Sequence, residues 1–296
     1  MDLKAYLAKR KALVDQALEK ELSENKGPAE ELSNAMSYSL FAGGKRLRPI
    51  LCLAGAEAAG ASIESAMPAA VALEMVHTYS LIHDDLPVMD DDDLRRGKPT
   101  NHKVFGEATA ILAGDGLLTE GFGVLIRAGS EGRADPHRAL AALEVIARAA
   151  GTRGMVAGQV LDLAAEGRDM DIGQVQFIHG HKSGKLIAAS VTSGGILGGA
   201  DKEQTRLLDR YGQCAGLAFQ IVDDILDIEG DPEVTGKMGG MDEVHGKATF
   251  PGVVGREKSW EMAKDLIAKA RASLAEFGSK AEPLHEIAAY FLTRRK

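Results

Sequence analysis

The sequence predicts an all-α fold. Alanine, leucine, glycine and isoleucine are plentiful, whereas aromatic residues make up only 5% of the chain. Closely packed helices favour this balance, while sheets favour β-branched and aromatic residues. No segment shows sustained alternation of apolar and polar residues, which is the pattern of a half-buried strand. With 296 residues and 45% hydrophobic content, the chain can bury one large core.

The expected helices follow one another with short turns between them. The first, at residues 2–24, has leucines recurring among lysines and glutamates in an amphipathic pattern. Glycine and proline turns, such as Gly43-Gly44, separate the segments that follow. These further helices are expected at residues 29–41, 47–60, 64–86, 104–128, 136–150, 152–166, 171–198, 202–229, 254–277 and 282–294.

Residues 230–252 differ from the rest because they are polar and rich in glycine. Loops of this length inside a compact domain are usually disordered or functional. Since this stretch directly follows an aspartate cluster, we interpret it as a flap over a functional site, with plain disorder as the alternative. No other linker resembles a domain boundary, so we expect residues 1–296 to form one domain.

Composition excludes several classes of protein. The net charge of −8 and the lack of a basic stripe argue against a nucleic-acid partner. Cys52 and Cys214 lie in apolar helical segments without metal-site spacing, which predicts buried free thiols and a reducing compartment. The amphipathic N-terminus lacks the apolar core of a signal peptide, and no apolar run approaches the ~20 residues of a membrane span. We therefore expect a cytoplasmic protein without a membrane partner.

An acidic cluster within residues 202–229 carries the first chemical signal. Asp223 and Asp227 are four residues apart, so on a helix they lie about 40° apart on one face. The residues around them are almost all apolar, which makes these carboxylates costly unless something positive meets them. A solvated acidic face is the alternative, and it fits apolar neighbours poorly.

A second acidic cluster lies at the end of the segment expected to be helical at 64–86. It runs Asp84-Asp85-Leu86-Pro87-Val88-Met89-Asp90 and continues through Asp93. Pro87 should end or kink the helix, so helical phase cannot place Asp90 beside Asp84. For Asp84 and Asp85 we expect metal ligation, whereas Asp91 to Asp93 fit a hydrated turn equally well.

Two carboxylate groups that face each other across a helical bundle form a site for hard cations. Oxygen-only ligands favour Mg²⁺ or Mn²⁺ over zinc, and Mg²⁺ typically combines one or two carboxylates with substrate phosphates. Basic residues flank both clusters in short glycine-containing turns, and Lys and Arg suit diphosphate oxygens. These are Lys45, Arg46, Arg48, Arg95, Arg96, His181, Lys182, Lys185, Lys237 and Lys247.

Taken in order, these motifs resemble those of trans-prenyltransferases, specifically short-chain isoprenyl diphosphate synthases of the bacterial farnesyl type. The resemblance covers nearly the whole chain and rests on GGKRLRP, the expanded first aspartate motif, LRRG, HKSGKL, FQIVDDILD and the later Gly-Lys pairs. It implies a single-domain bundle of about ten or more helices around a central cavity, and a homodimer. It also implies three Mg²⁺ ions, or Mn²⁺ in their place.

The resemblance also implies roles for individual residues. Asp84, Asp90 and Asp223 would be metal ligands, with Asp85, Asp224 and Asp227 ligating or supporting them. Isopentenyl diphosphate would be held by Lys45, Arg48, His77 and Arg96. The allylic diphosphate would be held by Arg95, Lys182, Ser183, Gln220, Lys237 and Lys247. Catalysis would depend above all on Asp84, Asp90, Asp223, Lys182 and Lys237.

The reaction implied is head-to-tail condensation of isopentenyl diphosphate with an allylic diphosphate. Groups aimed at the charge of the departing diphosphate stabilise the transition state, and an apolar cavity excludes water from the carbocation. In the resemblance, Tyr79 forms the cavity floor and implies a farnesyl product, although helix phase favours Ser80 and Tyr79 could instead pack in the core. The alternatives are a geranylgeranyl or other chain-length synthase, a terpene cyclase, and a non-catalytic partner subunit.

Overall fold

The structure is a computed structural model that describes residues 1–229 and 247–294. Its long elements are helices, which confirms the all-α prediction. The α-helices are α1 (Leu3–Glu24), α2 (Glu30–Leu40), α3 (Leu47–Ala58), α4 (Met67–Asp84), α5 (Asn101–Phe105), α6 (Glu107–Ser130), α7 (Pro136–Ala150), α8 (Met155–Ala165), α9 (Ile172–His179), α10 (Lys185–Leu197), α11 (Lys202–Glu229), α14 (Phe250–Val254), α15 (Arg256–Ala272) and α16 (Glu282–Thr293). The short elements are η1 (Ile63–Ser65), the π-helical turn η2 (Gly180–Gly184), η3 (Ala275–Ala281), β1 (Leu94–Arg95) and β2 (Lys98–Pro99).

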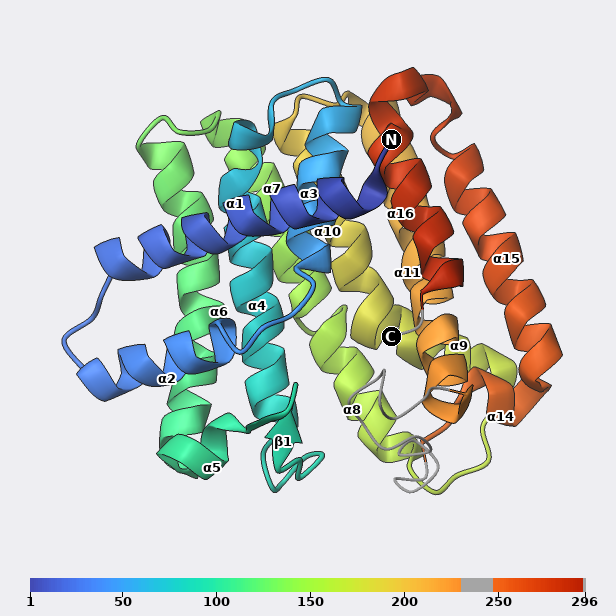
Figure 1. The fold of residues 1–296 in the computed structure, drawn as a ribbon, viewed down its shortest axis with the longest axis horizontal. Coiled ribbons are helices and arrows are strands. Elements are labelled where there is room, and N and C mark those ends of the chain that lie inside the picture. Colours follow the sequence, from blue (N-terminus) through green and yellow to red (C-terminus); the bar gives the residue numbers. More distant parts are fainter. Residues whose placement is uncertain (230–246, 295–296) are drawn as a thin grey trace.

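The long helices lie side by side, and α1 crosses them at a steep angle (Figure 1). Helix α4 packs against α6, and α10 packs against α3, α7 and α11. Helices α4 and α11 both run toward the lower end of the bundle in Figure 1, where the β1–β2 hairpin also lies. Because each acidic cluster is at the C-terminal end of one of these helices, the fold brings the two clusters to the same end.

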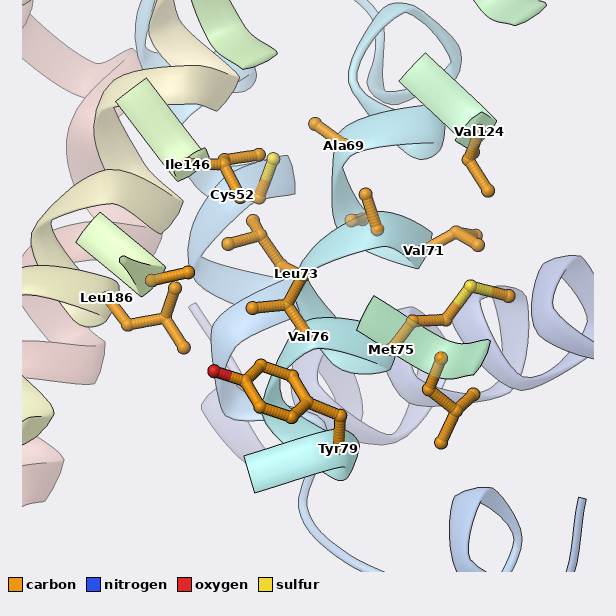
Figure 2. Close-up of a cluster of buried hydrophobic side chains, with 14 of the residues drawn as sticks. Cys52, Ala69, Val71, Leu73, Met75, Val76, Tyr79, Val124, Ile146 and Leu186 are labelled. Atoms are coloured by element: carbon orange, nitrogen blue, oxygen red, sulfur yellow. The ribbon is translucent and has the colours of Figure 1, made fainter. Parts of the chain in front are cut away.

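The core around α4 is built from aliphatic side chains. Leu73, Met75 and Val76 are fully or almost fully buried. In Figure 2, Leu73 and Val76 point toward Leu186, whereas Met75 points to the opposite side, toward Val124 of α6. Burying such side chains contributes about 1.5–3 kcal/mol each. Helix α4 is therefore packed on both sides, and this packing fixes the position of the acidic cluster at its C-terminal end.

Several expected boundaries differ from the structure, each for a local reason. The expected helix at 104–128 is two helices, because Gly106 has a φ of 82° that an α-helix cannot contain. Gly255 separates α14 from α15 in the same way, with a φ of 80°. The segment at 171–198 contains the π-helical turn η2. Residues 250–252, expected in a loop, are helical, and the rest of that expected flap up to residue 246 lies outside the described residues.

Two predictions about burial and hydropathy are modified. Both cysteines are free, as expected, but only Cys52 is fully buried, while Cys214 is partly exposed. Among the described residues one helix, α6, is long and apolar enough to cross a membrane by length and composition, contrary to the expectation from the sequence. Helix α6 packs against α4, α2 and α7, and core helices of soluble proteins pass the same test, so this is weak evidence for a membrane span.

Candidate active site

A cavity of about 950 Å³ opens at the end of the bundle where the acidic clusters lie. One part of its wall is charged, and the remainder is apolar, with Leu86, Met89, Ile111, Met155 and Leu163 among its lining residues. The residues predicted from the sequence that line it are Arg48, His77, Tyr79, Asp84, Asp90, Arg95, Lys182, Ser183, Asp227 and Lys247.

The turn after α4 fixes the position of Asp90 relative to Asp84, which helical phase could not predict. Helix α4 ends at Asp84, and beyond Pro87 the chain folds back so that the Asp90 N–H donates to the Asp84 carbonyl at 2.9 Å. Both residues line the cavity. Beyond them Asp91 is exposed, and Asp93, at the cavity rim, is paired with Lys103 at 2.7 Å, as fits a hydrated turn.

Asp84 is held in an environment that disfavours its charge. Burial raises the pKa of Asp84 to about 6, and the neighbouring Asp90 adds to this, whereas Lys182 opposes it. Desolvated carboxylates of like charge are stabilised when a cation binds between them. This part of the cavity wall therefore has the properties of a cation site.

Asp85 binds a neighbouring cationic side chain and does not line the cavity. It is 3% exposed, and the Arg95 guanidinium donates to its Oδ1 through Nε at 2.6 Å and lies 2.5 Å away through Nη2. Arg95 itself lines the cavity, whereas Asp85 does not. Asp85 therefore orients a cationic side chain toward the cavity.

The second cluster divides its three carboxylates in a similar way. Asp227 lines the cavity. Asp223 is not among the lining residues and pairs with Arg294 at 2.7 Å. Asp224 is 2% exposed and accepts hydrogen bonds from the Phe250 N–H at 3.0 Å and from Gln220 Nε2 at 3.3 Å. The structure thus places Asp223 and Gln220 beside the cavity rather than in its wall.

Lys182 is held by a contact that the sequence did not reveal. Its Nζ donates to Asp162 on α8 at 2.5 Å, and although burial opposes it, Asp162 and Asp84 raise the pKa of Lys182 above its usual value. On the same face of α8, a Cβ added to Gly158 would lie 2.2 Å from the backbone nitrogen of Lys182. Gly158 therefore lets α8 touch the π-helical turn that carries Lys182. The signal in the sequence is that Asp162 is the one charged residue of α8, whose other residues are apolar except for Gln159.

The cations flanking the cavity fall into two groups. Arg48 and His77 line it, whereas Lys45 and Arg96 are exposed and are not among its lining residues. Burial lowers the pKa of Arg48 to about 10, and burial together with the charges of Arg48 and Arg96 lowers the pKa of His77 well below its usual value. At neutral pH Arg48 is therefore charged and His77 is neutral.

Of the two lysines in the expected flap, the structure describes Lys247 but not Lys237. Lys247 lines the cavity, with its Nζ 3.6 Å from Asp90 Oδ1. Lys237 lies outside the described residues. The prediction for Lys247 thus has a geometric basis, and the prediction for Lys237 stays a prediction.

Tyr79 belongs to both the core and the cavity. It is 7% exposed and packs with the core cluster of α4. It also lines the cavity, and so does Ser80. Figure 2 shows Tyr79 at the end of that cluster, beyond Val76. Its ring lies edge-on to His83, with centroids 5.6 Å apart. Burial raises the pKa of Tyr79 to about 12, so the phenol is neutral at physiological pH.

The carboxylates fit a hard divalent cation that is only partly enclosed by protein. Within residues 1–229 and 247–294, no three acidic, histidine or cysteine side chains come together around one point. Mg²⁺ commonly takes one or two carboxylates and completes its coordination with water and substrate phosphates. Asp84 and Asp90, side by side in the cavity wall, provide that kind of partial site.

Comparison with known proteins assigns the chain to a family. Residues 29–282 match the polyprenyl synthetase family. The chain belongs to this family. As a polyprenyl synthetase family member it is a prenyltransferase, so the predicted enzyme class is confirmed and the terpene cyclase and non-catalytic alternatives are not supported.

Relatives of the same family resemble the chain over most of its length. A farnesyl diphosphate synthase of Geobacillus stearothermophilus is 51% identical over 86% of this chain and 85% of that protein. A chloroplastic heterodimeric geranylgeranyl pyrophosphate synthase large subunit of Arabidopsis thaliana is 46% identical over 99% of this chain and 80% of that protein. The crystal structure of a FPP/GFPP synthase from Zymomonas mobilis superimposes with a TM-score of 0.86 at 37% identity, covering 98% of this chain and 99% of that one.

Proposed function

We propose that the protein condenses isopentenyl diphosphate with dimethylallyl or geranyl diphosphate and releases farnesyl diphosphate. The observation that carries this proposal is that one cavity is lined both by Asp84, Asp90 and Asp227 and by Arg95, Lys182 and Lys247, with an apolar wall beyond them. Such a cavity has a polar part for diphosphates and an apolar part for a prenyl chain. The name of the relative at 51% identity gives independent support.

The proposed chemistry begins with cleavage of the allylic C–O bond. Arg95, Lys182 and Lys247 stabilise the negative charge that gathers on the departing diphosphate. The apolar wall keeps water from the allylic carbocation. The isopentenyl double bond then attacks the cation, and a proton is lost to the departing diphosphate, so no protein base is needed.

We also propose that the site binds three Mg²⁺ ions and that Asp84, Asp90 and Asp223 are their protein ligands. When bound, Mg²⁺ would neutralise part of the diphosphate charge and act as a Lewis acid. The carboxylates of Asp84 and Asp90 in the cavity wall support this assignment, and Mn²⁺ would serve in the same role. For Asp223 the support is its place on the helix of Asp227.

The farnesyl product is proposed over a longer one because Tyr79 is a bulky, buried side chain in the cavity lining. Geranylgeranyl diphosphate is the second candidate product, since relatives with that name are 45–46% identical to this chain. Incubation with isopentenyl diphosphate, each allylic diphosphate in turn and Mg²⁺, followed by sizing of the products, tests both. A linear farnesyl product supports the proposal, a geranylgeranyl product supports the second candidate, and no product from any pair contradicts both.

We further propose a homodimer, because α6 and α7 expose large apolar side chains at Leu112, Ile126 and Leu140, outside the cavity lining. Surfaces of this kind often mark protein–protein contacts. Sedimentation velocity on the wild type and on Ile126→Glu tests it: a dimer that dissociates in the variant is expected, and a monomeric wild type contradicts it. The cytoplasmic location and the lack of membrane and nucleic-acid partners remain predictions from the sequence.

A further inference from the structure

Arg46 has an unusual backbone conformation at the start of α3. It is the N-cap residue of that helix, with φ 54° and ψ 38°, in the left-handed region. Non-glycine residues adopt this conformation infrequently, and surrounding contacts must hold it. On the chain, Arg46 lies next to Lys45 and two residues before Arg48, both of which belong to the proposed isopentenyl diphosphate site.

The side chain of Arg46 reaches three separate elements. Its Nε donates to Asp15 of α1, its Nη1 donates to Glu74 of α4, and its Nη2 donates to the carbonyl of Leu40 at the end of α2, each at 2.7 Å. Arg46 is 3% exposed and is not among the residues that line the cavity. A guanidinium with five donors in a fixed fork suits three partners in different directions, and an ammonium group cannot reproduce this geometry.

The same turn also receives Arg96. Its guanidinium donates to the Gly43 carbonyl and lies against Gly44, where an added Cβ would be 2.6 Å from Arg96 Nη1. Gly43 and Gly44, which directly precede Lys45 and Arg46, thus form the surface that Arg96 packs against. If this turn moved, Arg96 would move with it.

Glu74 places a negative charge beneath these cations. It is 2% exposed, and its second oxygen, Oε2, has no hydrogen-bond partner among the described residues. Glu74 lies on α4, one turn before His77. Among nearby charges it makes the largest contribution that opposes the burial-lowered pKa of Arg48. It therefore holds Arg46 and helps to keep the neighbouring Arg48 guanidinium charged.

We propose that Arg46 is a positioning residue that keeps Lys45, Arg48 and Arg96 in place for isopentenyl diphosphate without touching the substrate. The inference rests on the proposed function together with the assignment of these cations to isopentenyl diphosphate, which the family resemblance implies. Its consequence is selective: loss of the Arg46 contacts weakens the binding of one substrate and not of the allylic one, whose cations Arg95, Lys182 and Lys247 are held by other contacts.

Steady-state kinetics of Arg46→Gln and Arg46→Lys, with each substrate varied while the other is saturating, test the proposal. We expect the KM for isopentenyl diphosphate to rise about tenfold in Arg46→Gln and by a smaller factor in Arg46→Lys. The KM for geranyl diphosphate should change less than twofold. Arg10→Gln is the matched control, because Arg10 also joins α1 to α3 through an ion pair, with Glu57. It should lower the melting temperature and leave both KM values unchanged.

The outcomes separate this proposal from the proposed function. If the wild type makes no prenyl product, the proposed function is wrong. If the wild type is active and the folded Arg46 variants change both KM values equally, or neither, the positioning role is wrong. Should circular dichroism show that Arg46→Gln is unfolded, Asp15→Asn replaces it, because Asp15 is partly exposed and its loss removes one contact. A KM for isopentenyl diphosphate unchanged in folded Asp15→Asn and Arg46→Lys would also contradict the role.

Discussion

The two aspartate clusters use different backbones to present similar groups. The second lies on regular helix α11, where the four-residue spacing of Asp223 and Asp227 sets their relative direction. The first lies at a helix end and across Pro87, and a hydrogen bond from the Asp90 N–H to the Asp84 carbonyl sets its geometry. A helix aligns carboxylates by its period, whereas a turn does so through particular contacts.

Each cluster also contains a buried carboxylate that serves a neighbour. Asp85 binds Arg95, and Asp224 accepts the Phe250 N–H. In each case the carboxylate that lines the cavity and the carboxylate that orients a neighbour are close in sequence. The number of acidic residues in a motif therefore overstates the number that face the cavity.

The largest effect is expected from the carboxylates assigned to metal. Asp84→Ala and Asp223→Ala should each reduce Mg²⁺-dependent condensation about a thousandfold, because charge stabilisation at the departing diphosphate is lost. Product formation under saturating substrates measures this, with circular dichroism as the check on folding. Asp91→Ala is the control, since Asp91 is exposed and outside the cavity lining, and should stay within about twofold. Near-normal turnover in Asp223→Ala alone would show that the clusters are not equivalent.

A smaller effect is expected where a carboxylate positions a cation. Asp162→Asn should lower kcat/KM for the allylic substrate about tenfold, because Lys182 would lose its ion-pair partner. Glu166→Gln, an exposed residue at the end of the same helix, provides the control. Equal losses in the two variants would contradict the positioning role of Asp162.

The first aspartate cluster differs from the second in a further respect, because its helix, α4, also carries the bulky side chain of Tyr79. Tyr79→Ala should shift the product from farnesyl toward longer chains, with little change in the rate of the first condensation. Ser80→Ala should leave the product unchanged, although Ser80 also lines the cavity. Chromatographic sizing of the products measures both. A farnesyl product from Tyr79→Ala would remove Tyr79 as the cavity floor.

The smallest effect concerns pH in metal-free protein. Because burial raises the pKa of Asp84 to about 6, the folded state binds this proton more tightly than the unfolded state. The charge of Asp84 thus destabilises the fold increasingly as pH rises from about 4 to about 6. Asp84→Asn should match the melting temperature of the wild type near pH 4 and exceed it near pH 7. A difference that is constant with pH would contradict this account.

The sequence was most informative where a regular period or a complete motif was present. The all-α class and the family follow from such patterns, whereas the common face predicted for Asp223 and Asp227 does not bring both to the cavity, because only Asp227 lines it. Asp90 could not be placed, because Pro87 interrupts the helical phase and the deciding hydrogen bond is between backbone atoms. Spacing alone also grouped Arg46 with its basic neighbours, and only burial separates it from them.

Asp162 and Gly158 escaped prediction for a different reason. Their contact with Lys182 joins α8 to a π-helical turn about twenty residues later, and the expected helix at 171–198 gave no sign of that turn. Long-range contacts of this kind depend on how helices pack. Local pattern does not encode them.

The contact between Asp224 and the Phe250 N–H has a consequence for how this chain can change over evolutionary time. His179 lies close to both sides of that contact, 3.5 Å from Asp224 and 3.3 Å from the Ala248 carbonyl. These contacts hold the residues that follow Lys247 in the chain and so keep Lys247 near Asp90. Substitutions at Asp224 or His179 over evolutionary time would therefore also displace Lys247 from its position near Asp90.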